Sequence, residues 1–147
     1  MRKTKFRGRR PDNGAWICGD LLHVAGGCLI YFGSETNTGE PDIDETNPIA
    51  VELYRDETAV VEPATVGQST GLHDKDGEEI FEGDILKMRV NNLVKICSVA
   101  WNEKVGAWCI AIAGPYYSLG TYSIGNWMAE GAEFEIVGNI HDNPKLI

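Results

Sequence analysis

The amino-acid sequence predicts a mainly β fold with little helix, on three observations. Short runs rich in Val, Ile, Trp and Tyr recur along the chain, and clusters of turn-forming residues separate them roughly every eight to twelve residues. No segment keeps the period of about 3.6 residues that marks an amphipathic helix. With 147 residues, 43% of them hydrophobic, the chain can bury a core without disulfides or metal, so we expect one compact unit.

The first half of the chain, residues 1–62, is expected to form a β-rich region that contains an exposed acidic loop at 33–48. A hairpin is predicted at its start, because Asn13-Gly14 favours the positive φ of a tight turn. A second tight turn is predicted at Gly26-Gly27. The expected strands of this half are 5–9, 15–24, 28–32, 49–53 and 58–61.

The second half, residues 63–147, begins at the break that Pro63 predicts. Its expected strands are 84–90, 93–101, 107–113 and 134–140. Apolar residues occupy both faces of the run 107–113, so we expect both faces to be buried, or one of them to be buried against a partner subunit. Residues 114–132 receive no assignment beyond one turn of helix around 126–128.

Charge is distributed unevenly along the chain. The net charge is −9, yet six of the thirteen Lys and Arg residues lie within the first ten positions. The acidic remainder repels phosphates, which disfavours a nucleic-acid partner. The basic start is interpreted either as the solvated face of a first strand or as a contact for an anion.

The four cysteines, Cys18, Cys28, Cys97 and Cys109, form no C-x-x-C pair and lie among apolar residues, where a thiol behaves as a small hydrophobe. This indicates reduced cysteines and a cytoplasmic setting. The longest apolar run, 105–113, is shorter than the ~20 residues of a membrane span. Residues 11–14 break the pattern of a secretory signal, so no membrane association is expected.

One motif suggests nucleophilic catalysis. The run 67–71 matches G-x-S-x-G with Ser69 as the nucleophile, and His73, His141 and Asp142 follow it as possible partners. Such a nucleophile lies on a sharp turn between a strand and a helix, whereas turn-forming residues follow Ser69. We therefore expect no catalytic set and no enzyme, with a serine esterase as the weakest alternative.

Metal and cofactor motifs are also weak. The run Asp74-x-Asp76-Gly77 matches part of a calcium loop, but in that register the first and twelfth ligand positions fall on Leu72 and Gly83, which have no carboxylate. The three histidines, His23, His73 and His141, lack the spacing of a zinc site. Neither a P-loop nor a dinucleotide-binding motif occurs, so no metal and no cofactor is expected.

Three stretches, 5–19, 66–85 and 137–144, together resemble the YopX-like proteins of phages and prophages, and the central stretch is the most specific. The resemblance spans nearly the whole chain in the family's order. It implies a phage or prophage origin, a small SH3-like barrel in the second half and a tendency to self-associate. It implies no reaction. Residues 66–85 are also explained by turn chemistry at 74–77 and 82–84 and by the strand that follows.

The function expected from these features is binding: a non-enzymatic, self-associating phage accessory protein in the host cytoplasm that binds a host or phage component. A more specific hypothesis is the sequestration of a small anionic, nucleotide-like signal in counter-defence. Aromatic side chains would stack on such a ligand, and arginines would hold its phosphate. The candidate ligand-binding residues are Arg7, Arg9, Arg10, Trp16, His73 and Trp127.

An alternative function is an acidic DNA mimic, or an inhibitor that binds a host protein through Asp42, Asp44 and Glu45 of the acidic loop. The two other tryptophans, Trp101 and Trp108, flank one predicted hairpin. We expect them in the core or in a subunit interface.

Overall fold

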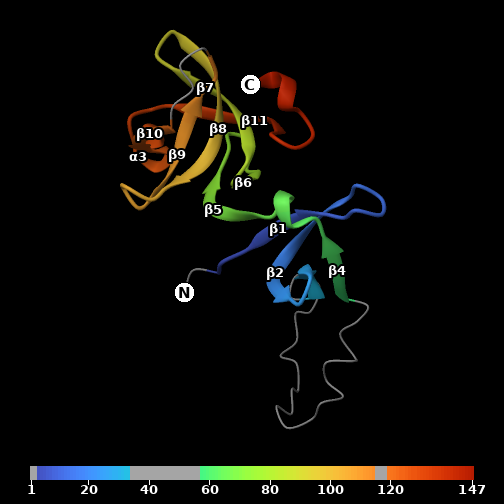
Figure 1. The fold of residues 1–147 in the computed structure, drawn as a ribbon. Coiled ribbons are helices and arrows are strands. Elements are labelled where there is room, and N and C mark those ends of the chain that lie inside the picture. Colours follow the sequence, from blue (N-terminus) through green and yellow to red (C-terminus); the bar gives the residue numbers. More distant parts are fainter. Residues whose placement is uncertain (1–2, 34–56, 115–118) are drawn as a thin grey trace. The chain divides into compact units, whose positions relative to one another are not determined.

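The computed structural model describes residues 3–33, 57–114 and 119–147 (Figure 1). The chain divides into two compact units, Met1–Gln68 (unit 1) and Ser69–Ile147 (unit 2). Each unit is built on antiparallel strands, so the predicted mainly β fold is confirmed. The acidic loop and the predicted strand at 49–53 lie outside the described residues.

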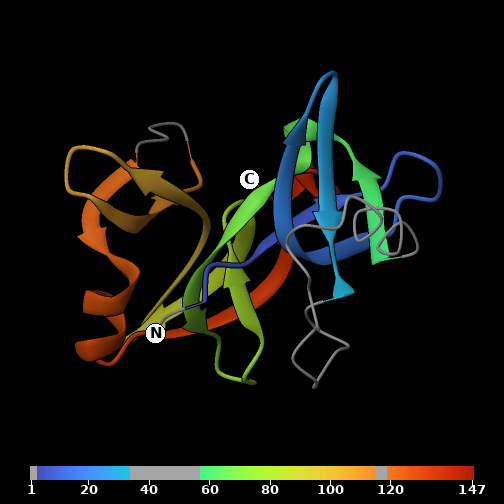
Figure 2. The same cartoon turned by 90° about the horizontal axis from the view of Figure 1, so that it is seen from below.

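Unit 1 is a twisted sheet in the order β4-β3-β2-β1 (Figure 1, Figure 2). Its strands are β1 (Phe6–Arg9), β2 (Trp16–Val24), β3 (Gly27–Tyr31) and β4 (Thr58–Val61), and the 3-10 turn η2 (Pro63–Thr65) follows them. The first two residues of β5 (Gly67–His73) pair with β1 on its other side. Both predicted hairpin turns form, with φ of 71° at Gly14 and 88° at Gly26.

One face of the unit 1 sheet carries its core. The core residues are Cys28, Ile30 and Val61, and Phe6, Ile17, Leu21 and Val66 pack around them. Side chains alternate between the faces of a strand, so the residues between these positions point to the opposite face. We call that opposite face, defined by Arg7, Arg9, Trp16, Leu22, Val24, Leu29 and Val60, the outer face.

In unit 2, the rest of β5 pairs with β6 (Glu79–Phe81). The unit also contains a five-stranded sheet in the order β10-β9-β8-β7-β11. The strands of this sheet are β7 (Asp84–Val90), β8 (Leu93–Asn102), β9 (Ala107–Ile112), β10 (Leu119–Ser123) and β11 (Glu133–Asn139). The helix α3 (Ile124–Ala129) follows β10, and the 3-10 turn η3 (Pro144–Leu146) follows β11.

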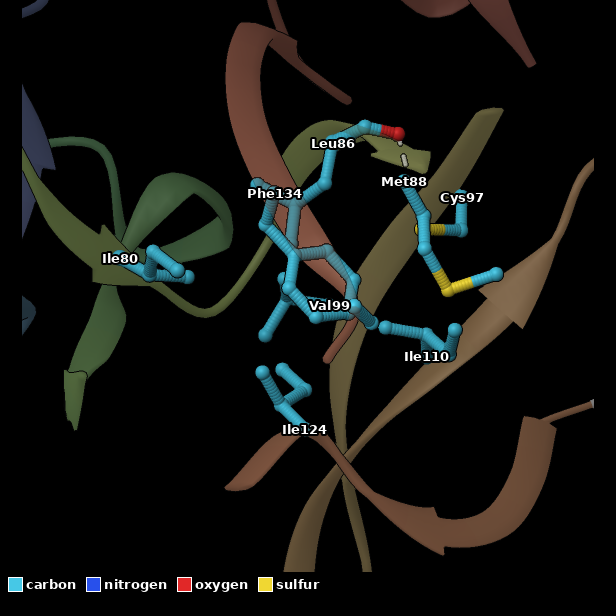
Figure 3. Close-up of a cluster of buried hydrophobic side chains, with 9 residues drawn as sticks. Ile80, Leu86, Met88, Cys97, Val99, Ile110, Ile124 and Phe134 are labelled. Atoms are coloured by element: carbon cyan, nitrogen blue, oxygen red, sulfur yellow. Dashed lines mark hydrogen bonds between the residues drawn. The ribbon is translucent and has the colours of Figure 1, made fainter. Parts of the chain in front are cut away.

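The core of unit 2 surrounds Phe134, which is 2% exposed (Figure 3). The other buried members are Ile80, Leu86, Met88, Cys97, Val99, Ile110, Ile124 and Ala132. Burial raises the pKa of Cys97 to about 12, and its Sγ donates to the carbonyl of Leu86 at 3.5 Å, as drawn in Figure 3. This thiol is therefore neutral and behaves as the apolar core residue that the sequence predicted.

Most predicted strands form where the sequence placed them. The strands at 58–61 and 84–90 have the predicted bounds, and the predicted helical turn is α3. Cys109, Ile110 and Ala111 are all buried, so both faces of β9 are covered, as predicted.

Three strands, β5, β6 and β10, were not predicted, and the predicted turn after Ser69 begins only beyond His73, where β5 ends. The sequence of β5, Gly-Gln-Ser-Thr-Gly-Leu-His, contains two glycines and only one β-branched residue, Thr70. Its polar side chains are satisfied by the neighbouring strand: Thr70 Oγ1 donates to the carbonyl of Ile80 at 2.8 Å. Pairing with β6 therefore outweighs the low strand propensity of β5.

The last strand of the five-stranded sheet, β11, has its open edge covered by the turn at 74–77. The backbone N–H of Lys75 donates to the carbonyl of Phe134 at 2.8 Å, and the N–H of Ile136 donates to Asp74 Oδ2 at 3.1 Å. Farther along β11, the N–H of Asn139 donates to Asn143 Oδ1 at 3.2 Å. These contacts occupy groups that could otherwise pair with another chain.

Candidate functional site

The basic first strand places two of its arginines beside a tryptophan. In the β1–β2 pairing Arg9 lies opposite Trp16 and Arg7 lies opposite Cys18, so all four side chains share the outer face. The guanidinium carbon of Arg7 lies 4.9 Å from the centroid of the Trp16 ring. A cation at this distance from an aromatic face is attracted by about 0.5–1 kcal/mol at a half-exposed site. The structure therefore brings together Arg7 and Trp16, two of the predicted ligand-binding residues.

The other two arginines hold carboxylates of the chain itself. Arg9 Nη2 lies 3.0 Å from Glu62 Oε2. Arg10 forms a bidentate pair with Asp12, with Nη2 to Oδ2 at 2.6 Å and Nε to Oδ1 at 3.0 Å. The hydrogen bonds from Arg10 lower the pKa of Asp12. A phosphate would have to compete with these carboxylates for both arginines, and a base would have to displace Arg7 to stack on the same face of Trp16.

The outer face of unit 1 also carries an apolar row whose end members are exposed. Leu22 pairs with Leu29, and Leu29 pairs with Val60, so the three side chains cross β2, β3 and β4 side by side. Leu22 is 44% exposed and Val60 is 58% exposed, and Val24 extends the row along β2. Because the opposite face already holds the core, the sheet is apolar on both faces, as in a sheet that packs between two layers.

Ser69 lies in the middle of β5 and not on a turn between a strand and a helix. It is 4% exposed, its Oγ donates to Glu79 Oε1 at 2.6 Å, and the same oxygen accepts from the N–H of Gly71 at 3.0 Å. His73 lies at the end of the strand, opposite Glu79. The hydroxyl therefore makes its hydrogen bonds within the β5–β6 pair. It lacks the exposed position that the serine of a nucleophile elbow has.

We expect no hydrolysis of p-nitrophenyl acetate by the wild-type protein above the rate in buffer, and the same result for Ser69→Ala. The reason is that the hydroxyl is buried and donates to a carboxylate, so it cannot reach an ester carbonyl. A spectrophotometric assay of p-nitrophenol release tests this. Turnover by the wild type that is lost in Ser69→Ala would contradict the prediction.

Asp74 has a structural role in the turn that resembles a calcium loop. Its Oδ1 accepts from the N–H groups of Asp76 and Glu78 at 2.9 and 3.0 Å, and its Oδ2 accepts from Ile136. Burial alone would raise the pKa of Asp74, but the three backbone donors outweigh it, so the pKa is lowered. Within the part of the chain that the structure describes, no group of His, Cys, Asp or Glu is placed to hold a metal ion.

The two remaining predicted ligand-binding residues, His73 and Trp127, belong to unit 2. His73 lines an open depression of about 430 Å³, together with residues that include Met128 and Phe134. Trp127 does not line this depression but packs against the core of unit 2. The predicted partner-binding residues Asp42, Asp44 and Glu45 lie outside the described residues.

An aromatic corner on unit 2 was not identified from the sequence. The rings of Tyr122 and Trp127 have centroids 5.2 Å apart and planes at 81°, and the Tyr122 hydroxyl donates a hydrogen bond to Glu130. This hydrogen bond, burial and the negative charge of Glu130 raise the pKa of Tyr122, so the phenol stays neutral. One local feature of the sequence could have indicated this corner: Tyr122 directly precedes Ser123, the N-cap of α3, and Glu130 directly follows α3.

Trp101 and Trp108 face each other across the β8–β9 hairpin, with ring centroids 5.1 Å apart and an interplanar angle of 70°. Trp108 packs against the unit 2 core, whereas Trp101 is 43% exposed. The prediction that these tryptophans pack in the core is therefore confirmed for Trp108.

Among the described residues, no helix has the length and apolar composition needed to cross a bilayer.

Comparison with known proteins gives a family and a fold. A family model described as YopX protein matches residues 5–147. The crystal structure of protein EF1440 from Enterococcus faecalis is similar at a TM-score of 0.51 and 20% sequence identity, and the alignment covers 99% of each chain. At this identity the similarity shows a shared fold. A search of curated proteins gave no match.

Proposed function

The chain belongs to the YopX family, and from this premise we propose that it is a non-enzymatic, self-associating accessory protein of phages or prophages that binds a host or phage component. The observation that carries the proposal is the apolar row Leu22, Leu29 and Val60, in which Leu22 and Val60 are exposed and Leu29 is half-buried. Contiguous exposed aliphatic side chains on a sheet face are typical of a surface that another protein covers.

A second copy of the chain fits this face. Two copies related by a twofold axis would place the same rows against each other at about 10 Å, the spacing of packed sheets. Association through the open edge of β11 is less favourable, because Asp74, Lys75 and Asn143 already bond to that edge. The proposal therefore assigns self-association to the outer face of unit 1.

We expect the wild type to exceed the monomer mass in native mass spectrometry and in size-exclusion chromatography with light scattering. The double variant Leu22→Glu with Val60→Glu should associate at least about thirtyfold more weakly, because it buries charge in an apolar contact. Since the net charge of −9 makes the copies repel, association should tighten as NaCl rises.

The matched control is Leu93→Glu with Val94→Glu, which changes two exposed aliphatic residues of β8 in unit 2. This control should associate like the wild type. A wild type that is monomeric at high micromolar concentration, or a control that dissociates as readily as the outer-face variant, would contradict the proposal. The same mass spectra report any small molecule that copurifies from infected cells, which tests the nucleotide-sequestration hypothesis.

A further inference from the structure

The Tyr122–Trp127 pair forms a corner of two aromatic surfaces on unit 2. The two ring planes meet at 81°, so their faces point in perpendicular directions. Tyr122 is 39% exposed, whereas Trp127 is half-buried and packs against the core. One wall of the corner is therefore fixed by the core and the other is open to a ligand.

A carboxylate is held at this corner by the end of α3. The backbone N–H of Glu130 donates to the carbonyls of Asn126 and Trp127 at 3.1 and 3.2 Å, and Ala132 also donates to Trp127 at 2.9 Å. Gly131 allows this ending because its φ is 94°. The Tyr122 hydroxyl donates to Oε1 of Glu130, which fixes the carboxylate beside the rings.

Glu130 carries the negative charge at this corner. Glu133 and Glu135 lie farther along the chain on β11, where the register puts them opposite Arg89 and Lys87 of β7. Glu130 has no Lys or Arg partner among the described residues, so its charge is not neutralised within the described part of the chain. Two aromatic faces and one free carboxylate oxygen are complementary to a positive group.

We propose that Tyr122, Trp127 and Glu130 form a binding site for an organic cation, the guanidinium of an arginine or an alkylammonium group. The ring faces attract the cation through their quadrupoles, and Glu130 supplies the opposite charge at their edge. The site does not depend on self-association through the outer face, because its residues all lie in unit 2.

The test uses the full-length protein labelled with ¹⁵N and a short glycine-arginine peptide with blocked ends. The indole N–H signal of Trp127, assigned with Trp127→Phe, should shift and saturate as the peptide is added. The same peptide with neutral citrulline in place of arginine should give no shift. Blocked arginine amide and spermidine, added separately, show whether a protein segment or a small amine binds more tightly.

Glu130→Gln and Tyr122→Leu should each weaken peptide binding about fivefold or more. Tyr122→Phe keeps the ring but loses the hydrogen bond to Glu130, so its affinity should lie between those of the wild type and Tyr122→Leu. The control Glu103→Gln removes an exposed carboxylate from the β8–β9 turn and should have no effect. Equal shifts with the arginine and citrulline peptides, or an equal loss in Glu103→Gln and Glu130→Gln, would overturn the proposal. Thermal unfolding by circular dichroism shows that each variant is folded.

Discussion

Asp74→Ala is expected to lower the free energy of unfolding by roughly 3–5 kcal/mol, because three backbone N–H groups in part-buried hydrogen bonds lose a charged acceptor. The two donors within the turn at 74–77 and the N–H of Ile136 would then have no protein partner. Urea unfolding followed by tryptophan fluorescence measures the change. The variant should also aggregate more readily, since the edge of β11 loses part of its cover.

The control for this variant is Asp76→Ala in the same turn. Asp76 is exposed, and its carboxylate lies 3.5 Å from Lys75 Nζ, a surface pair worth less than about 1 kcal/mol. Its substitution should leave the unfolding midpoint nearly unchanged. Equal losses in the two variants would contradict the assignment of the edge cover to the Asp74 carboxylate.

The pH dependence of the Asp74 contribution follows from its lowered pKa. A group whose pKa is depressed in the folded state stabilises the fold above its unfolded value, which is about 3.9 for Asp. That stability is lost as the pH falls through the folded pKa. The difference in stability between wild type and Asp74→Ala should therefore be constant above about pH 5 and shrink below about pH 4.

Gly19→Ala is expected to destabilise unit 1 by about 3 kcal/mol or more. A Cβ at Gly19 would lie 1.9 Å from the carbonyl oxygen of Tyr31 and 2.7 Å from its carbonyl carbon. Both atoms belong to the backbone of the neighbouring strand, so only separation of β2 from β3 relieves the clash. Thermal and urea unfolding measure the loss, and weaker self-association should accompany it because the outer face is distorted.

Gly27→Ala provides the matched control in β3. A Cβ there would meet nothing within 4 Å, and the residue is not among the glycines with positive φ. The change should be neutral or slightly stabilising, because alanine lowers the entropy of the unfolded chain. A Gly19→Ala variant as stable as Gly27→Ala would show that β2 and β3 do not approach each other as closely as the structure places them.

The candidate site was predicted in part. Arg7 and Trp16 were both selected from the sequence, and the turn predicted at Asn13-Gly14 between two β-like runs was enough to place them on adjacent strands. The two other arginines differ in how far away along the chain their carboxylate partners lie. Asp12 is two residues from Arg10, whereas Glu62 is 53 residues from Arg9. No local pattern indicates the second pair, which holds Arg9 on a carboxylate of the chain itself.

The sequence by itself determined where most strands begin and end, which turns need glycine, how charge is divided along the chain and to which family the chain belongs. These properties depend on residues close together, whose alternation and turn chemistry act locally. The tertiary structure alone decided which partner each strand and side chain meets. The polar strand β5 forms because β6 satisfies it, and Asp74 covers β11 across 62 positions. The apolar row crosses β2, β3 and β4 because the register of three strands aligns it. Such contacts join distant residues through packing and pairing, which periodicity along a single segment cannot specify.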